Sequence, residues 1–326
     1  MTDLKETIVT AVKEDLAAIE AALEENLKPH FALVRETAGH LLFSGGKRFR
    51  PLLLVLSARL CGRSDPFVTR FSIIGEYLHA ATLLHDDVVD GAAMRRGKEV
   101  ASSVWDAATA VLTGDFLLAR ALSIAAESNR PDIIRVIAEI TELMSQGEIQ
   151  QLADKGNTGL TEETYREVIR CKTGALIEGS CRTGAMLADG NKAQCRALEA
   201  YGANVGLAFQ MADDLLDFTA DAAVLGKAPG ADVREGKMTL PTIHARQQAD
   251  AVDGTFIDRI LASPDISADD FKQFVHLLEK YGSIDYTRRQ AEEHVRRAKA
   301  ELQSFSPSVT VETMNNIADY TLARKM

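Results

Sequence analysis

Hydrophobic residues recur at three- and four-residue intervals along most of the chain, a spacing typical of amphipathic helices. The prolines fall at the edges of the periodic segments, and the stretches between them are rich in Ala, Leu, Glu, Lys, Gln and Arg, which favour helices. No run of alternating β-branched residues predicts a strand. The pattern predicts an all-α fold of ten or more helices, with segments over 3–27, 67–90, 105–127, 132–153, 161–188 and 191–220.

Two of the predicted segments, 71–89 and 104–126, are apolar around most of their circumference. Helices of that kind are buried among other helices. The chain contains no Pro/Ser-rich linker, no low-complexity tract and no repeat of fixed period. We therefore predict a single-domain helical bundle over 1–326.

Composition and charge exclude several classes of protein. The 326 residues carry a net charge of −10, so a basic surface for nucleic acid is not expected. The N-terminus lacks the pattern of a signal peptide, and no apolar run approaches the roughly 18 residues that cross a bilayer. The four cysteines form no C-x-x-C pair and no metal-ligand spacing with histidine. We predict a soluble, cytoplasmic protein with reduced thiols.

Two clusters of aspartates lie in otherwise apolar sequence, LLHDDVVDG at 83–91 and AFQMADDLLDF at 208–218. Like charges at helical i, i+4 spacing repel, and buried carboxylates are costly, so a cation is expected beside them. Mg²⁺ suits such oxygen ligands, with substrate phosphates completing its shell. One cluster alone is equally consistent with an acidic helix surface, whereas two favour metal sites on facing helices that hold a diphosphate. The candidate ligands are Asp86, Asp87, Asp90, Asp213, Asp214 and Asp217, with Gln210 on the second stripe.

The stretch SGGKRFRP at 44–51 predicts an anion site, because Gly45, Gly46, Lys47 and Arg50 lie just before a helix that Pro51 can open. It lacks the spacing of a P-loop. His79 lies two helical turns before Asp86, where a core histidine is the alternative. Surface charge is the alternative for each of the later cations, which are Arg95, Arg96, Lys172 (followed by Thr173), Lys227 and Lys237.

These motifs together resemble those of the trans-prenyl diphosphate synthases. The resemblance runs through GGKRFRP, EYLHAATLLHDDVVD, MRRG, GDFLLARA, GEIQQL, CKTGAL, AFQMADDLLD and LGKAPGADVREGKMTLP. It implies an all-α isoprenoid synthase fold around a central cavity, usually as a homodimer. The sequence departs from the family at Gly91, where long-chain relatives commonly have an acidic residue, and in VWDAATAVL.

The resemblance also implies a reaction, in which Mg²⁺ ions, typically three, stabilise the diphosphate leaving an allylic substrate. Isopentenyl diphosphate then attacks the allylic cation, and loss of a proton gives a product five carbons longer. The implied catalytic residues are Asp86, Asp90, Lys172, Asp213 and Lys227. The implied contacts of the allylic diphosphate are Arg95, Lys172, Gln210 and Lys227, with Thr173 and Lys237 as further substrate contacts. The implied isopentenyl diphosphate pocket, free of metal, consists of Gly46, Lys47, Arg50, His79 and Arg96.

Product length is predicted from the residues before Asp86, where the growing chain would run. Ala81 and Thr82 are small there, although Tyr77 can narrow the tunnel one turn further on. An open tunnel predicts a product of about thirty-five to fifty carbons, octaprenyl-like and used for quinone side chains. A farnesyl or geranylgeranyl synthase, a class I terpene cyclase and a non-catalytic synthase subunit are the alternatives. Contact with a membrane would be at most transient, since no basic amphipathic helix supports it.

Overall fold

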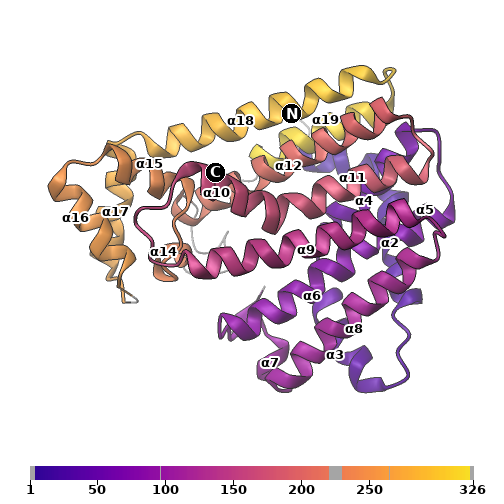
Figure 1. The fold of residues 1–326 in the computed structure, drawn as a ribbon, viewed down its shortest axis with the longest axis horizontal. Coiled ribbons are helices and arrows are strands. Elements are labelled where there is room, and N and C mark those ends of the chain that lie inside the picture. The colour runs from indigo at the N-terminus through magenta and orange to yellow at the C-terminus, as the bar shows by residue number, and fades with distance from the viewer. Residues whose placement is uncertain (1–3, 96, 220–229, 264, 324–326) are drawn as a thin grey trace. The chain divides into compact units, whose positions relative to one another are not determined.

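The computed structural model describes residues 4–95, 97–219, 230–263 and 265–323, which are almost entirely helical (Figure 1). They divide into two compact units, each described here by itself. The first unit comprises Met1–Thr141, Gly179–Glu199 and Ser304–Met314, and the second comprises Glu142–Glu178, Ala200–Gln303 and Asn315–Met326. The predicted all-α fold class is confirmed.

The first unit contains the N-terminal helices and a short hairpin. Its elements are α1 (Leu4–Ala11), α2 (Lys13–Asn26), α3 (Ala32–Leu42), α4 (Phe49–Leu60), α5 (Pro66–Ser72), α6 (Ile74–Val89), β1 (Met94–Arg95), β2 (Lys98–Glu99), α7 (Ala101–Val104) and α8 (Ala107–Ala126). Here α6 and α8 lie side by side (Figure 1). Their close packing depends on Gly114, since a Cβ there would lie 2.3 Å from Nε2 of His85. His85 therefore fills the space between two helices, as expected of a structural histidine.

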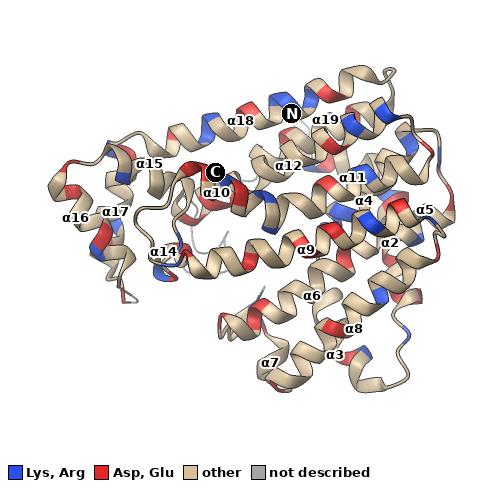
Figure 2. Cartoon of the chain, viewed as in Figure 1, with Lys and Arg blue, Asp and Glu red and all other residues tan. Residues whose placement is uncertain are grey.

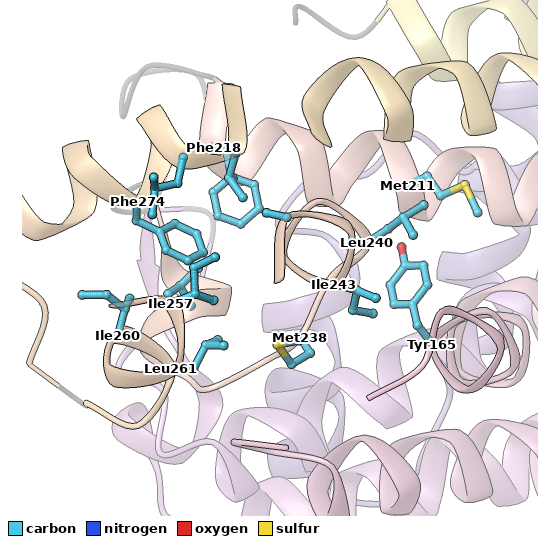
Figure 3. Close-up of a cluster of buried hydrophobic side chains, with 14 of the residues drawn as sticks. Tyr165, Met211, Phe218, Met238, Leu240, Ile243, Ile257, Ile260, Leu261 and Phe274 are labelled. Carbon is cyan, nitrogen blue, oxygen red and sulfur yellow. The ribbon is translucent and has the colours of Figure 1, made fainter. Parts of the chain in front are cut away.

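The second unit contains most of the C-terminal half. Its elements are α10 (Glu162–Ile169), the π-helical turn η1 (Arg170–Gly174), α14 (Ala231–Arg234), α15 (Leu240–Gln248), α16 (Ala251–Leu261), α17 (Ala268–Lys280), α18 (Ser283–Glu301) and the 3₁₀ turn η2 (Leu302–Ser304), which ends in the first unit. Four helices contribute residues to both units: α9 (Pro131–Ala153), α11 (Ala175–Leu187), α12 (Lys192–Thr219) and α19 (Val309–Ala323). Figure 3 shows the apolar core of this unit, in which Phe218 and Phe274 lie 6.0 Å apart between ring centres.

Side-chain caps explain where several helices begin. The N-cap residue accepts a hydrogen bond from a backbone N–H of the first turn, which satisfies a donor that the helix itself leaves unpaired. Asp65 does so for Val68 at the start of α5, where Pro66 is the first helical residue. The same arrangement begins four other helices, at Asp106, Thr161, Asp250 and Ser267.

Three details of the sequence prediction are corrected. The segments 3–27 and 67–90 each form two helices rather than one, α1 and α2 in the first and α5 and α6 in the second. No strand was expected, yet β1 and β2 pair as a two-residue antiparallel hairpin, because Gly91 and Gly97 adopt positive φ and let the chain turn sharply after α6. Strands this short carry no periodicity for a sequence pattern to detect.

The third correction concerns α8, which is long and apolar enough, by length and composition alone, to cross a membrane. Figure 2 shows few charged bands along this helix. A core helix of a soluble protein has the same composition, so the finding is weak evidence for a membrane span. One side of α8 packs against α6, whereas Leu112 and Leu122 are exposed.

Candidate active site

The first aspartate motif ends α6 in the first unit. Asp86 is half-buried, Asp90 caps the helix and is exposed, and Asp87 is buried with 3% of its surface exposed. The buried carboxylate accepts hydrogen bonds from Nε and Nη2 of Arg95, at 2.8 and 2.7 Å. Asp87 therefore fixes Arg95 at the end of α6, while Asp86 and Asp90 are both at least partly exposed to solvent.

The basic loop lies in the same unit and precedes α4. Lys47 is exposed, and Arg50 is half-buried in the first turn of the helix. A Cβ on Gly75 of α6 would lie 3.1 Å from the Cβ of Arg50, so α6 and the start of α4 approach closely at this point. His79 lies one turn after Gly75 and is half-buried. The structure thus brings together Arg50 and the helix that carries His79, two segments that the sequence assigned to one pocket.

The second aspartate motif, on α12 in the second unit, divides by burial. Asp213 is exposed, whereas Asp214 and Asp217 are 3% and 1% exposed. Asp217 accepts hydrogen bonds from the backbone N–H groups of Ala231 and Asp232, at 3.3 and 3.0 Å. Its role in the structure is to hold the start of α14 against α12, which places the Asp232 side chain beside the motif.

Asp214 lies among the core residues of the second unit, and its two oxygens accept separate hydrogen bonds. The Tyr165 hydroxyl donates to Oδ2 at 2.6 Å, and the Gln210 amide donates to Oδ1 at 2.8 Å. Burial raises the pKa of Asp214 to about 8, and the nearby carboxylates of Asp232 and Asp213 add to the increase. The increase comes first from burial and then from the crowding of carboxylates, so a cation bound beside them would favour the ionised form of Asp214.

The aspartate carboxylates suit Mg²⁺ that binds together with a substrate diphosphate. Across the part of the chain that the structure describes, no three His, Cys, Asp or Glu side chains are arranged to hold a metal ion by themselves. Mg²⁺ usually keeps several waters and binds through one or two carboxylates together with substrate phosphates. The accessible carboxylates Asp86, Asp90 and Asp213 suit that mode, since each can offer oxygens to an ion that arrives with its diphosphate.

Lys172 and Thr173 lie on the π-helical turn η1, a rare element that is frequently found at functional sites. The Lys172 ammonium contacts Glu148 at 2.6 Å and donates to Gln151 at 2.7 Å. The Thr173 hydroxyl donates to the Gln210 carbonyl oxygen at 2.9 Å. Gln210 thus bridges Thr173 and Asp214, so that a chain of hydrogen bonds connects the turn to the second aspartate motif.

Two glycines make room for this turn. A Cβ on Gly147 of α9 would lie 2.6 Å from the backbone nitrogen of Lys172, and one on Gly206 of α12 would lie 2.8 Å from Cα of Gly174. Real Cβ atoms essentially never approach backbone atoms so closely. Glycine at both positions lets the wider π turn pack between its neighbouring segments, which sets where Lys172 and Thr173 project.

A pocket of about 100 Å³ lies within the second unit. Its lining brings together Lys172, Thr173, Gln210, Asp213, Asp214 and Lys237, all predicted as site residues. Lys237 forms an ion pair with Glu235 at 2.5 Å. Two predicted residues, Arg96 and Lys227, lie outside the described residues.

The same pocket contains residues that the sequence analysis missed, which are Gln151, Asp154, Tyr165 and Asp232. Tyr165 lies on α10, 49 positions before its partner Asp214, and no local spacing connects the two. Glu148, which pairs with Lys172, was likewise missed. Asp232 had a signal in the sequence, because it lies between two predicted cations in the stretch LGKAPGADVREGK.

An all-α fold that holds two aspartate motifs and several cationic side chains has the groups needed to bind divalent cations and diphosphate esters. A family model described as Polyprenyl synthetase matches residues 31–278, about three quarters of the chain. The chain belongs to the polyprenyl synthetase family. It is a polyprenyl diphosphate synthase, a trans-prenyltransferase.

The chain aligns with individual relatives along nearly its whole length and theirs. The chain is 34% identical over 323 residues to an all-trans-nonaprenyl-diphosphate synthase (geranyl-diphosphate specific) of Rhodobacter capsulatus, covering 99% of this chain and 98% of the relative. It is 34% identical to the octaprenyl diphosphate synthase of Escherichia coli, with 98% of each chain covered. A crystal structure of polyprenyl synthase from Caulobacter crescentus, complexed with calcium and isoprenyl diphosphate, is similar with a TM-score of 0.93, 35% identity and 98% of each chain covered. The predicted isoprenoid synthase fold is confirmed.

Proposed function

We propose that this synthase makes a long-chain all-trans polyprenyl diphosphate of about thirty-five to fifty carbons, used for quinone side chains. The observation that carries the proposal is the small size of Ala81 and Thr82, one turn before Asp86 on α6. Neither side chain can end a hydrocarbon tunnel at that level. Tyr77 is fully buried, and its hydroxyl donates to the Leu23 carbonyl at 3.1 Å, an arrangement that favours core packing over a role at the tunnel wall.

The metal ligands in this proposal are the accessible carboxylates. Enzymes of this family use a divalent metal, and we assign Mg²⁺, three ions per site, to Asp86, Asp90 and Asp213. Asp87, Asp214 and Asp217 support them, because each is buried and already holds protein groups in place. When bound, the ions neutralise the diphosphate leaving group as its bond to the allylic carbon breaks.

We divide the predicted contact residues into two sets, one for each diphosphate substrate. Arg95 and Lys172 bind oxygens of the allylic diphosphate, and Gln210 and Thr173 orient that part of the site through their hydrogen bonds to each other. Lys227 and Lys237 add positive charge there. Gly46, Lys47, Arg50, His79 and Arg96 bind isopentenyl diphosphate without metal. This division has a chemical reason, since the homoallylic diphosphate must not ionise and needs cations without a metal cluster.

We further propose that the enzyme is a homodimer. Leu112 and Leu122 of α8 are 66% and 41% exposed, and Val89 of the neighbouring helix α6 is 60% exposed. Homodimer interfaces are rich in apolar side chains, so these exposed residues are the candidates that we assign to the dimer face. Leu112→Glu is expected to convert dimer to monomer in sedimentation analysis, and an unchanged mass would contradict the assignment of this face.

We propose a cytoplasmic location because the four cysteines are free, as is usual in a reducing compartment, and their side chains are buried or half-buried. A single domain over 1–326, the lack of a nucleic-acid partner and at most transient contact with a membrane surface stay predictions.

The test of the proposed function is product analysis by mass with Mg²⁺, isopentenyl diphosphate and an allylic starter. A ladder that ends at one polyprenyl diphosphate within the proposed range is expected. A product of fifteen or twenty carbons would contradict the long-chain proposal and leave the reaction class intact. Release of pyrophosphate with a hydrocarbon product would instead indicate a terpene cyclase.

A further inference from the structure

Arg48 lies between Lys47 and Arg50, two residues of the proposed isopentenyl diphosphate pocket, but its surroundings differ from theirs. Only 5% of Arg48 is exposed, whereas Lys47 is exposed. The backbone of Arg48 is left-handed, with φ 48° and ψ 37°. A residue with a side chain adopts this conformation rarely, and it persists only where the surroundings hold it. The contacts of the guanidinium identify what holds it.

The guanidinium of Arg48 bridges three helices. Nε and Nη2 donate to the two carboxylate oxygens of Glu20 on α2, at 2.6 and 3.0 Å. Nη1 donates to Glu76 on α6 at 3.1 Å, and Nη2 also donates to the Leu42 carbonyl at the end of α3, at 2.7 Å. The planar fork of an arginine can satisfy partners in several fixed directions at once, which a lysine cannot do.

The loop itself is shaped around this side chain. A Cβ on Gly46 would lie 3.1 Å from Nη1 of Arg48, tighter than nearly all real Cβ contacts. Gly46 therefore leaves room for the guanidinium, a reason for glycine there that is separate from any contact with a phosphate. The backbone carbonyl of Arg48 accepts the hydrogen bond from Leu52 that begins α4. The position of Arg48 thus sets both the loop before it and the helix after it.

Glu76 connects this loop to the other half of the pocket. It is buried, with 7% exposed, and lies on α6 three residues before His79, on the same side of the helix. We propose that Arg48 is a positioning residue for isopentenyl diphosphate. Through its buried ion pair with Glu76, it fixes the loop of Lys47 and Arg50 against the part of α6 that carries His79. The inference rests on the proposed assignment of these residues to that substrate.

The test is Arg48→Lys, which keeps the charge but loses the fork. We expect KM for isopentenyl diphosphate to rise about tenfold, because small displacements of positioning groups weaken binding. KM for the allylic substrate should stay within about twofold, and kcat at saturation should be largely retained. Equilibrium binding of isopentenyl diphosphate to the metal-free protein, measured by calorimetry, should weaken by the same factor as KM.

The matched control is Arg59→Lys. Arg59 forms an ion pair with Asp15, its Nη1 donating at 3.1 Å, and this pair also joins α2 to the α4 region but does not contact the loop. We expect the control to lower thermal stability without a selective change in either KM. If Arg48→Lys changes both KM values equally, or only lowers stability as the control does, the positioning role is wrong.

A second variant keeps the test decisive if Arg48→Lys folds poorly. Glu76→Gln removes the charge of the buried partner but keeps its shape and an acceptor oxygen, and Glu20 still pairs with Arg48, so folding should tolerate it. We expect a smaller rise in KM for isopentenyl diphosphate, about threefold, with no change for the allylic substrate. No change in either KM would overturn the inference. Failure of the wild-type protein to elongate any allylic starter would instead overturn the proposed function itself, so the two failures are distinguishable.

Discussion

The Tyr165 hydroxyl donates a 2.6 Å hydrogen bond to Oδ2 of Asp214, and both side chains are buried. The tyrosine lies on α10 and the aspartate on α12, so the bond joins two helices of the second unit. Burial raises the pKa of Tyr165 well above its ordinary value, and the neighbouring Asp214 carboxylate adds to the increase. Tyr165 therefore stays a donor at any physiological pH and fixes the orientation of Asp214 next to the exposed Asp213.

We predict that Tyr165→Phe destabilises the protein by about 1–3 kcal/mol, because a buried carboxylate loses one of its two side-chain donors. The free energy of unfolding in denaturant measures the change. Tyr281→Phe is the control, since the Tyr281 hydroxyl donates to Asp253 at 2.7 Å in a more exposed setting and its loss should matter little. Equal stability changes in the two variants would contradict this explanation, because the hydrogen bond from Tyr165 to Asp214 would then contribute no more than an exposed one.

Helix periodicity predicted which residues share a stripe but could not predict which of them are buried. Gln210, Asp213, Asp214 and Asp217 were expected on one stripe, yet only Asp213 is exposed. The reason lies in the tertiary packing, since α14 covers Asp217, and Asp214 meets Tyr165 in the core. A short spacing is local information, whereas burial depends on segments far along the chain.

The π-helical turn shows the same limit. The motif CKTGAL identified Lys172 and Thr173 as site residues, but nothing in it distinguishes a π turn from an α turn. Two glycines far from the turn in sequence make room for it. Gly147 approaches Lys172, about 25 positions later, and Gly206 approaches Gly174, about 32 positions earlier. The chemistry of the site was therefore predictable from the sequence, and the backbone geometry that supports it was not.

Gly206→Ala tests whether that geometry matters for function. The new Cβ would lie 2.8 Å from Cα of Gly174, so one of the two segments must shift, at a cost of about 1–3 kcal/mol in stability. Because the shift moves the turn, we also expect a higher KM for the allylic substrate in steady-state kinetics. Gly39→Ala is the control. The new Cβ there would lie 3.4 Å from the Phe43 ring, which is an ordinary contact, so the variant should be as stable as the wild type or more stable. If allylic KM stays normal, the turn does not position Lys172.

Asp213→Asn tests the accessible metal ligands. The substitution keeps the shape but removes the charge, so we expect kcat/KM to fall at least about a hundredfold and the Mg²⁺ concentration for half-maximal rate to rise. Asp189→Asn is the control and should leave the rate and the Mg²⁺ dependence unchanged. The Asp189 side chain is 80% exposed and, among the described interactions, pairs only with Arg130. Its positive φ is one that asparagine adopts readily. A normal Mg²⁺ dependence in Asp213→Asn would remove that residue from the metal site.

Ala81→Tyr tests the proposed tunnel. Ala81 is 4% exposed and precedes Asp86 by five residues on α6, so a phenol ring there should block a growing chain. We expect products shortened sharply, toward fifteen or twenty carbons, in the mass analysis of the wild-type reaction. Thr82→Ser, a change of one methyl group, should leave the length unchanged. A full-length product from Ala81→Tyr would show that the chain does not run along this part of α6.

His294 gives a prediction about pH that is independent of the metal site. Arg166 donates to Nε2 of His294 at 3.1 Å, so the ring is neutral and its Nδ1–H donates to Asn204 at 2.8 Å. Burial, with the positive charges of Arg166 and Arg297, lowers the pKa of His294 to about 4, against about 6.5 in the unfolded chain. The histidine of the unfolded chain therefore becomes protonated as the pH falls below about 6.5, whereas the folded protein binds this proton only near pH 4.

The stability that this histidine contributes should thus be complete above about pH 6.5 and should decrease as the pH falls toward 4, by up to about 3 kcal/mol. His294→Gln removes the titrating group, and its amide can still accept from Arg166 or donate to Asn204. Unfolding free energies of both proteins between pH 7 and pH 4.5 isolate the effect, because the carboxylates common to both cancel in the difference. We expect the wild type to lose more stability than the variant over this interval. Parallel curves would mean that His294 titrates normally, and that the buried network of Arg166 and Asn204 does not hold the ring neutral.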